Sequence, residues 1–281
     1  MRSGMTSTPT RTLPSGDEMP LVGFGTWDID ESAVGDAVRT ALDAGYTHVD
    51  TAEGYKNEAG IGPAIAEHDR EDLFLTSKVL PSNLHYESVL EACEASLDRL
   101  GTSYLDLFLI HWPNPTISLR ETLDAMARLH ETGKVRNVGV SNFTRYQLMF
   151  ARRVSDVPIA VNQVEFHPWL YQADLLAYCE ENDIVLTAAA PLARTRVLDD
   201  DTIASIAAEY DRSPAQVVLR WQVQKGVVTI PKSTTPAHIR ANLDVFDWEL
   251  DPADVERIDA IERSERIYMI DLADETYGIP R

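Results

Sequence analysis

Lysine is the scarcest charged residue type in this chain of 281 residues. Only five of its 25 basic residues are lysines, whereas 45 residues are acidic and the formal net charge is −20. A charge this negative repels polyanions, which argues against nucleic acids and anionic membranes as partners. Any anionic ligand must therefore find a local positive site. An acidic composition that avoids lysine is also typical of proteins adapted to high salt, so we expect a halophilic protein.

Cysteine and long apolar runs are also nearly absent. The two cysteines, Cys93 and Cys179, lie in helix-like segments without metal-ligand spacing. We therefore expect small buried side chains, no disulfide framework and no metal site. No run of about 18 uninterrupted apolar residues is present, and the first residues, MRSGMTSTPTRT, lack the apolar core of a signal peptide. These features predict a cytoplasmic protein with a flexible N-terminus over residues 1–11.

The glycine fingerprint of dinucleotide-binding folds is missing. The segment GFGTWD supplies Gly23 and Gly25, but Asp28 stands where a third glycine is required. This disfavours a doubly wound nucleotide-binding domain, which is the alternative fold for a chain that alternates strands and helices.

Eight β-like runs alternate with amphipathic helical segments between residues 20 and 245. The runs cover residues 21–27, 47–51, 73–79, 104–111, 135–141, 159–165, 184–190 and 226–232. Alternating strands and helices imply parallel pairing, and eight such units in roughly 250 residues is the size of a (β/α)8 barrel. We therefore predict the α/β class and a single (β/α)8 TIM barrel domain over residues 12–281. Residues 12–20 are predicted to form a hairpin closing the barrel floor, and residues 251–281 a helix and a tail.

Ionisable residues end three consecutive strands of this predicted barrel. Asp50 ends the second run, Lys78 lies at the end of the third and His111 ends the fourth. Because the carboxyl ends of barrel strands open onto one face, these side chains should meet there. Tyr55 follows on the next loop, and a nearby ammonium would lower the pKa of its phenol, which starts near 10. A proton donor with no nucleophile beside it suits carbonyl reduction by an external hydride.

The chain resembles the aldo-keto reductases from about residue 12 to the end of the barrel, and in particular their prokaryotic diketogluconate-reductase-like members. The motifs that carry the resemblance are GFGTW, HVDTAEGYKNE, LTSKV, LIHWP, GKVRNVGVSNF, VNQVEFHP and VVTIPKSTTPAHIRANLDVFDWEL. The resemblance implies a catalytic tetrad. Tyr55 would be the general acid, Lys78 would tune its pKa, Asp50 would pair with Lys78, and His111 would orient the carbonyl.

A nicotinamide cofactor is also implied by the resemblance, with NADPH preferred. The positions implied for cofactor binding are Thr26, Trp27, Asp50, Ser141, Asn142, Gln163, Leu192, Lys232, Ser233, His238 and Asn242. The substrate is implied to be a small carbonyl compound, possibly sugar-derived, in a pocket formed by Trp27, Tyr55, His111 and Trp112. The C-terminal tail, near Tyr277, is expected to narrow this pocket.

Three positions depart from the pattern of the family. Ala189 stands where an aromatic ring usually stacks on the nicotinamide, and His238 stands where an arginine commonly binds the 2′-phosphate. A third difference, Ala241, replaces a frequent glutamate at the adenine. Histidine is mostly neutral at pH 7, so we expect the preference for NADPH to be weaker than usual, with some use of NADH.

Other interpretations remain open at this point. Ser141 and Asn142 could form a strand-end turn that caps the next helix, and His167 has no evident partner, so we assign it a structural role. The whole chain could also be a nicotinamide-binding regulatory module with little turnover, or a metal-dependent barrel hydrolase. An intact tetrad favours an NADP-dependent reductase over both. We also expect the protein to be a monomer.

Overall fold

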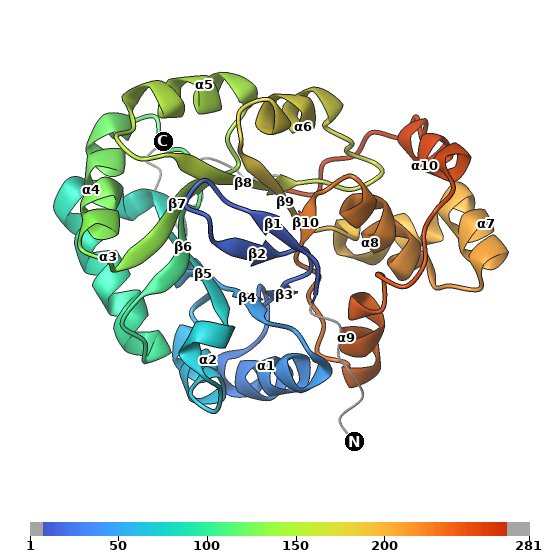
Figure 1. Ribbon diagram of the computed structural model, residues 1–281, viewed down its shortest axis with the longest axis horizontal. Coiled ribbons are helices and arrows are strands. Elements are labelled where there is room, and N and C mark those ends of the chain that lie inside the picture. The colour runs from blue at the N-terminus through green and yellow to red at the C-terminus, as the bar shows by residue number, and fades with distance from the viewer. Residues whose placement is uncertain (1–7, 269–281) are drawn as a thin grey trace.

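A closed barrel of parallel strands forms the centre of the protein (Figure 1). The computed structural model describes residues 8–268. Neighbouring strands pair in chain order from β3 to β10. The first and last strands also meet, because Val22 and Thr229 form a parallel bridge and the N–H of Gly23 donates to the carbonyl of Thr229 at 2.8 Å. The predicted (β/α)8 barrel is confirmed.

The barrel strands follow one another at the positions predicted from the sequence, although several are shorter. They are β3 (Phe24–Gly25), β4 (His48–Asp50), β5 (Phe74–Val79), β6 (Leu105–Ile110), β7 (Val135–Ser141), β8 (Ile159–Glu165), β9 (Val185–Ala189) and β10 (Val228–Thr229). Every residue of β6 is buried, because one face of a barrel strand packs in the interior and the other packs against helices.

Helices surround the strands on all sides, as Figure 1 shows. They are α1 (Glu31–Ala44), α2 (Glu58–Ile65), α3 (Tyr86–Leu100), α4 (Leu119–Glu131), α5 (Arg145–Val154), α6 (Ala173–Glu180), α7 (Asp201–Tyr210), α8 (Pro214–Gln224), α9 (Pro236–Leu243) and α10 (Pro252–Asp259). Short 3-10 helices are η1 (Glu53–Tyr55), η2 (Arg70–Asp72), η3 (Pro81–Asn83) and η4 (Ala193–Asp199). No helix between residues 8 and 268 is long and apolar enough to cross a membrane.

Helix α1 shows how the sequence sets the limits of these elements. The Asp30 side chain accepts the backbone N–H of Ser32 at its start, and Gly45 ends it in the left-handed conformation, with φ 106°. Its apolar face is buried, as expected for an amphipathic helix on the outside of a barrel. The buried residues of α1 are Val34, Ala37, Val38, Ala41 and Leu42.

A hairpin lies at the amino-terminal end of the barrel, as predicted for residues 12–20. Its strands are β1 (Thr10–Thr12) and β2 (Glu18–Pro20), which pair antiparallel. In its turn, Asp17 accepts a hydrogen bond at 2.7 Å from the side chain of Asn137, a residue of β7. The hairpin begins at Thr10, two residues before the start that we expected for the ordered domain.

Both cysteines lie on helices, as the sequence indicated. Cys93 belongs to α3 and Cys179 to α6, and both are buried free thiols. Burial raises the pKa of each thiol to about 12. They therefore behave as small core side chains.

Candidate active site

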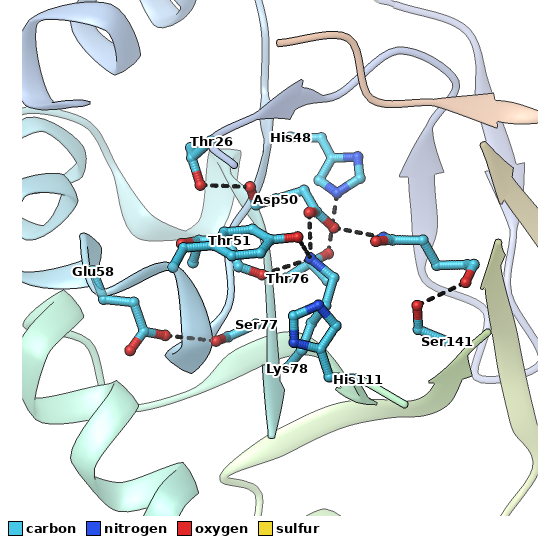
Figure 2. A network of polar contacts seen from close by, with 12 residues as sticks. Thr26, His48, Asp50, Thr51, Glu58, Thr76, Ser77, Lys78, His111 and Ser141 are labelled. Atoms are coloured by element: carbon cyan, nitrogen blue, oxygen red, sulfur yellow. Dashed lines mark hydrogen bonds and ion pairs between the residues drawn. The ribbon is translucent and has the colours of Figure 1, made fainter. Parts of the chain in front are cut away.

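The four residues of the expected tetrad meet at the carboxyl ends of neighbouring strands. Asp50 ends β4, Lys78 lies in β5, His111 follows β6, and Tyr55 ends η1. The Nζ atom of Lys78 lies 2.5 Å from Oδ1 of Asp50 and 3.2 Å from the Tyr55 hydroxyl oxygen. The rings of Tyr55 and His111 meet edge to face, with centroids 5.5 Å apart. Figure 2 shows Asp50, Lys78 and His111 converging on one point.

Lys78 is a fully buried cation. Its exposed fraction is 0%, and its ammonium also donates to the carbonyl oxygen of Thr51 at 2.8 Å. Burial lowers the pKa of Lys78 from its ordinary value, while the Asp50 carboxylate opposes that change. Because an unpaired buried charge is costly, the short ion pair with Asp50 is what makes an ammonium tolerable at this position.

His111 is buried beside this ammonium. Burial and the charge of Lys78 both hold the pKa of His111 well below its ordinary value. The imidazole is therefore neutral at pH 7, with one ring nitrogen as a donor and the other as an acceptor. A neutral ring of this kind can donate a hydrogen bond to an uncharged oxygen in the cavity.

Two side chains fasten the loop that carries Tyr55. The Glu53 carboxylate accepts the backbone N–H of Leu80 at 3.0 Å, which ties the loop to the end of β5. The buried Asn57 amide donates to the carbonyl of Thr26 at 2.9 Å, which ties it to the end of β3. Tyr55 is thereby held between the two strand ends.

Polar groups at the ends of β7 and β8 bond directly to the tetrad. The Gln163 amide donates to Oδ2 of Asp50 at 2.7 Å, and the Asn142 amide donates to the backbone carbonyl of His111 at 3.0 Å. The Ser141 hydroxyl donates to the backbone carbonyl of Gln163 at 2.7 Å. These neutral side chains therefore share one network with the charged pair.

Neither Ser141 nor Asn142 caps the helix that follows β7. The N-cap of α5 is Thr144, whose hydroxyl accepts the N–H of Gln147 while the Gln147 side chain accepts the N–H of Thr144. The capping alternative is therefore wrong. Asn142 has a left-handed backbone, with φ 62°, a conformation that non-glycine residues seldom adopt and that recurs at functional sites.

A cavity of about 690 Å³ opens beside the tetrad. The expected site residues that line it are Thr26, Trp27, Asp50, Tyr55, His111, Trp112, Ser141, Asn142, Gln163, Leu192, Lys232, Ser233 and His238. Two expected residues are not in the lining. Lys78 is fully buried in contact with Asp50 and Tyr55, and Asn242 is a buried residue of α9. One cavity thus unites most of the positions selected from the sequence.

A basic side chain lies in the part of the cavity wall that follows β10. Within residues 8–268, the lysines in ion pairs are Lys78, Lys134 and Lys225, so Lys232 has no carboxylate partner there. The neighbouring Ser233 hydroxyl accepts the N–H of Thr235 at 3.1 Å, just before α9 begins. This segment offers a cation, a hydroxyl and a helix N-terminus together.

The loop after β9 brings an unexpected arginine to the cavity. Ala189 lines the cavity wall, so no aromatic ring lies at this position. Beyond it, Arg194 and Thr195 have left-handed backbones, with φ 51° and 71°. The guanidinium of Arg194 lies 4.3 Å from the centroid of the Trp27 ring. We did not select Arg194 from the sequence, because no glycine marks this turn.

Part of the C-terminal tail forms another wall of the cavity. Ile267 and Tyr268 line it, and the Tyr268 ring meets the Trp112 ring edge to face at 6.3 Å between centroids. We had expected this wall near Tyr277, which lies outside the described residues. No periodic pattern in the sequence marks Tyr268.

His167 has a partner that the sequence did not reveal. Its Nε2 atom lies 2.8 Å from Oε1 of Glu165, and both side chains are fully buried. The assumption that nothing pairs with His167 is therefore wrong. Glu165 ends β8 and also binds the tail.

Comparison with known proteins agrees with this geometry. Residues 21–263 match the model of the aldo/keto reductase family. The chain is 43% identical over 261 residues to the glyoxal reductase of Bacillus subtilis, with 92% of this chain and 94% of that protein covered. The Bacillus subtilis oxidoreductase YtbE is 43% identical over 263 residues, with coverage of 91% and 94%.

A solved structure is similar over the same extent. The aldo/keto reductase of Brucella melitensis is 42% identical, has a TM-score of 0.85, and matches 90% of this chain and 98% of its own. The narrower likeness to diketogluconate-reductase-like members stays a prediction. A family model that spans the barrel, relatives matched over nearly their full length and a tetrad at the strand ends lead to one assignment: the chain belongs to the aldo/keto reductase family of oxidoreductases.

Proposed function

We propose that this protein reduces aldehyde and ketone carbonyls to alcohols with NADPH, and that Tyr55 is the general acid. The observation that carries the proposal is the buried ammonium of Lys78, which lies 2.5 Å from Asp50 and 3.2 Å from the Tyr55 hydroxyl. A cation so close to a phenol stabilises the phenolate, the form that remains once Tyr55 has donated its proton.

The cavity residues fit a nicotinamide dinucleotide phosphate. Ser141, Asn142 and Gln163 offer neutral donors and acceptors beside the tetrad, which suit a carboxamide. Lys232 has no carboxylate partner within residues 8–268, and Ser233 lies beside it, so the two can hold a 2′-phosphate near the N-terminus of α9. When bound, the reduced nicotinamide supplies the hydride.

Each tetrad residue has a separate task in this proposal. The neutral imidazole of His111 donates a hydrogen bond to the carbonyl oxygen and orients it. Tyr55 gives the proton on its hydroxyl to the same oxygen, and Lys78 stabilises the phenolate left behind. Asp50 compensates the charge of Lys78, and Gln163 holds Asp50 in place. In alcohol oxidation, the Tyr55 phenolate takes the proton back.

The side chains around the tetrad limit the choice of substrate. Trp27 and Trp112 supply apolar walls beside Tyr55 and His111, which suits small carbonyl compounds, including sugar-derived ones. Because one relative of this chain is a glyoxal reductase, glyoxal is the first substrate to test. At position 238 an imidazole replaces the permanently charged guanidinium of the arginine that is common there, so we infer a modest preference for NADPH over NADH.

Three further properties remain proposals. We infer that the protein acts in the cytoplasm, as a monomer, and in high salt, from its composition and its charge of −20. The same charge supports the inference that nucleic acids and membranes are not partners.

Oxidation of NADPH followed at 340 nm with glyoxal and larger carbonyls tests the proposal. Wild type should turn over, and Tyr55→Phe should lower kcat by at least about a hundredfold, because general acid catalysis contributes about 10² to 10⁴. The matched control is Tyr146→Phe, which should keep wild-type activity, because Tyr146 is 81% exposed and does not line the cavity. NADPH binding without any turnover would support the regulatory module instead.

A further inference from the structure

Glu165 is a buried carboxylate that the proposed chemistry does not use. Its Oε1 atom accepts the backbone N–H of Ile267 at 2.6 Å and lies 2.8 Å from Nε2 of His167. Its Oε2 atom accepts the backbone N–H of Tyr268 at 2.8 Å. Burial alone would raise the pKa of Glu165, but these hydrogen bonds outweigh it and hold the pKa below its ordinary value. The carboxylate is therefore ionised at neutral pH.

The contacts join two distant parts of the chain at the cavity. Glu165 ends β8, whereas Ile267 and Tyr268 are about a hundred residues further on, in the tail after α10. Hydrogen bonds to an ionised, buried acceptor are shorter and stronger than those between neutral groups. The carboxylate thus determines where the backbone of these two tail residues lies.

The tail residues held in this way face the substrate. Tyr268 lines the same cavity as Tyr55, and its ring packs edge to face on Trp112. The charge of Arg194 also lies 5.9 Å from the centroid of the Tyr268 ring. A shift of the tail backbone would therefore move an aromatic wall of the pocket without moving the tetrad.

We propose that Glu165 is a positioning residue for substrate selectivity, which fixes the Tyr268 ring as a wall of the pocket by binding the backbone of Ile267 and Tyr268. The inference rests on the proposed reduction of carbonyls at Tyr55. None of the contacts described for the Glu165 side chain is made to a member of the tetrad. Its loss should therefore affect which substrates bind more than how fast a bound substrate reacts.

The ion pairs of the tail are on the surface. Glu265 pairs with Arg196 at 2.7 Å and with Arg263 at 2.5 Å, but both arginine side chains are more than half exposed. Exposed ion pairs contribute little, because water competes for both charges. Glu265 is therefore a suitable control for the loss of one carboxylate at the tail.

The decisive variant is Glu165→Gln. It keeps the size of the side chain, but it removes the charge and turns an NH₂ donor toward a backbone N–H or toward His167, where an acceptor is needed. KM and kcat are measured with NADPH for glyoxal and for an aromatic aldehyde such as 4-nitrobenzaldehyde. Because an aromatic contact contributes about two- to tenfold in affinity, we expect KM for the aromatic aldehyde to rise by that factor.

The same variant is digested with trypsin under native conditions. Arg263 and Arg266 are exposed residues of the tail, so release of the tail should speed cleavage after them. We expect cleavage there to be at least several times faster in Glu165→Gln. Glyoxal has no aromatic ring to pack on Tyr268, so its KM and kcat should stay within about twofold of wild type.

Two further variants show whether the rise in KM comes from the lost hold on the tail. Glu265→Gln should leave the aromatic KM and the cleavage rate near those of wild type. Tyr268→Ala should raise the aromatic KM as Glu165→Gln does, without faster cleavage of the tail, and the double variant should show no further rise in KM. If Glu165→Gln does not fold, Tyr268→Ala still tests whether this ring selects substrates.

The possible failures can be told apart. Wild-type selectivity and wild-type cleavage in Glu165→Gln would overturn the positioning role. An equal rise of KM for both substrates, together with weaker NADPH binding, would also overturn it, since that pattern means a general distortion. If wild type reduces neither substrate, the proposed function fails, and the cleavage assay alone decides whether Glu165 holds the tail.

Discussion

Replacement of Lys78 by methionine removes the one charge on which the proposed chemistry depends. Methionine has a similar length and keeps the buried volume, but the contacts to Asp50, Tyr55 and the carbonyl of Thr51 are lost. We expect both catalysis and stability to fall, for separate reasons.

The catalytic effect follows from the 3.2 Å distance between Nζ of Lys78 and the Tyr55 hydroxyl. At an effective dielectric constant near 20, an ammonium and a phenolate at this distance attract each other by about 5 kcal/mol. Water at the open side of the cavity screens this attraction, so we take about 3 kcal/mol as the stabilisation of the phenolate by Lys78. Its loss predicts a fall in kcat of about a hundredfold.

The stability effect follows from Asp50. Removing one partner of a buried ion pair costs about 3 to 5 kcal/mol, because the other charge stays buried without compensation. Asp50 keeps its hydrogen bond from Gln163 at 2.7 Å. We therefore expect the lower end of this range, which is a loss of about 3 kcal/mol in the free energy of unfolding.

The chain offers a matched control in Lys225→Met. Nζ of Lys225 lies 2.7 Å from Asp259 and 3.2 Å from the hydroxyl of Tyr171, so the same three residue types meet outside the cavity. This variant should lose stability in urea unfolding but keep wild-type kcat with NADPH and glyoxal. If Lys78→Met also keeps kcat within about threefold, the assignment of Lys78 to the tuning of Tyr55 is refuted.

Four other perturbations have expected outcomes. Burial lowers the pKa of His48 from 6.5 to about 4 in the folded protein. Between pH 6.5 and pH 4 the unfolded chain therefore binds a proton that the folded protein does not, and the free energy of unfolding falls as the pH falls. His48 should account for about 2 kcal/mol of the stability lost between pH 7 and pH 5 in urea unfolding. His111, whose pKa is also held low, should add to the total loss, so His48→Gln should reduce the loss by about 2 kcal/mol and His68→Gln should leave it unchanged. His238→Arg should raise the ratio of kcat/KM for NADPH over NADH about fivefold or more, and an unchanged ratio would exclude contact with the 2′-phosphate. Ala189→Tyr should lower the Kd of NADPH about two- to tenfold by stacking, whereas weaker binding would mean that no room exists for a ring. Finally, the midpoint of thermal unfolding should rise in molar KCl, because salt screens repulsion within a chain of charge −20, and a midpoint independent of salt would contradict the halophilic interpretation.

The barrel could be predicted from the sequence because each strand is a short apolar run between amphipathic helices. The ends of the strands could not be predicted equally well. β10 has only Val228 and Thr229, although the apolar run around it is longer. Beyond this short strand, the backbone of Pro231 bonds to Gly25 across the closure of the barrel. That closure depends on long-range pairing, which no local pattern records.

The meeting of the tetrad residues could be predicted because Asp50, Lys78 and His111 lie at the ends of adjacent strands, and Tyr55 lies on the loop after the first of these strands. Glu165, Arg194 and Tyr268 could not be selected in this way. Glu165 contacts a tail about a hundred residues away, and Tyr268 lies at the cavity with its backbone N–H bonded to that carboxylate. Arg194 depends on a left-handed turn without glycine. In each case the decisive contact is tertiary, and the local sequence carries no sign of it.

The most direct test of the central claim is the fate of a label during turnover. NADPH that carries deuterium at the reactive C4 position is incubated with wild-type protein and glyoxal, and the alcohol product is examined by mass spectrometry. We predict one deuterium on the carbon that was the carbonyl, and no labelled alcohol with Tyr55→Phe in the same time. An alcohol without deuterium, or equal labelling in the variant, would contradict the account of hydride transfer assisted by Tyr55.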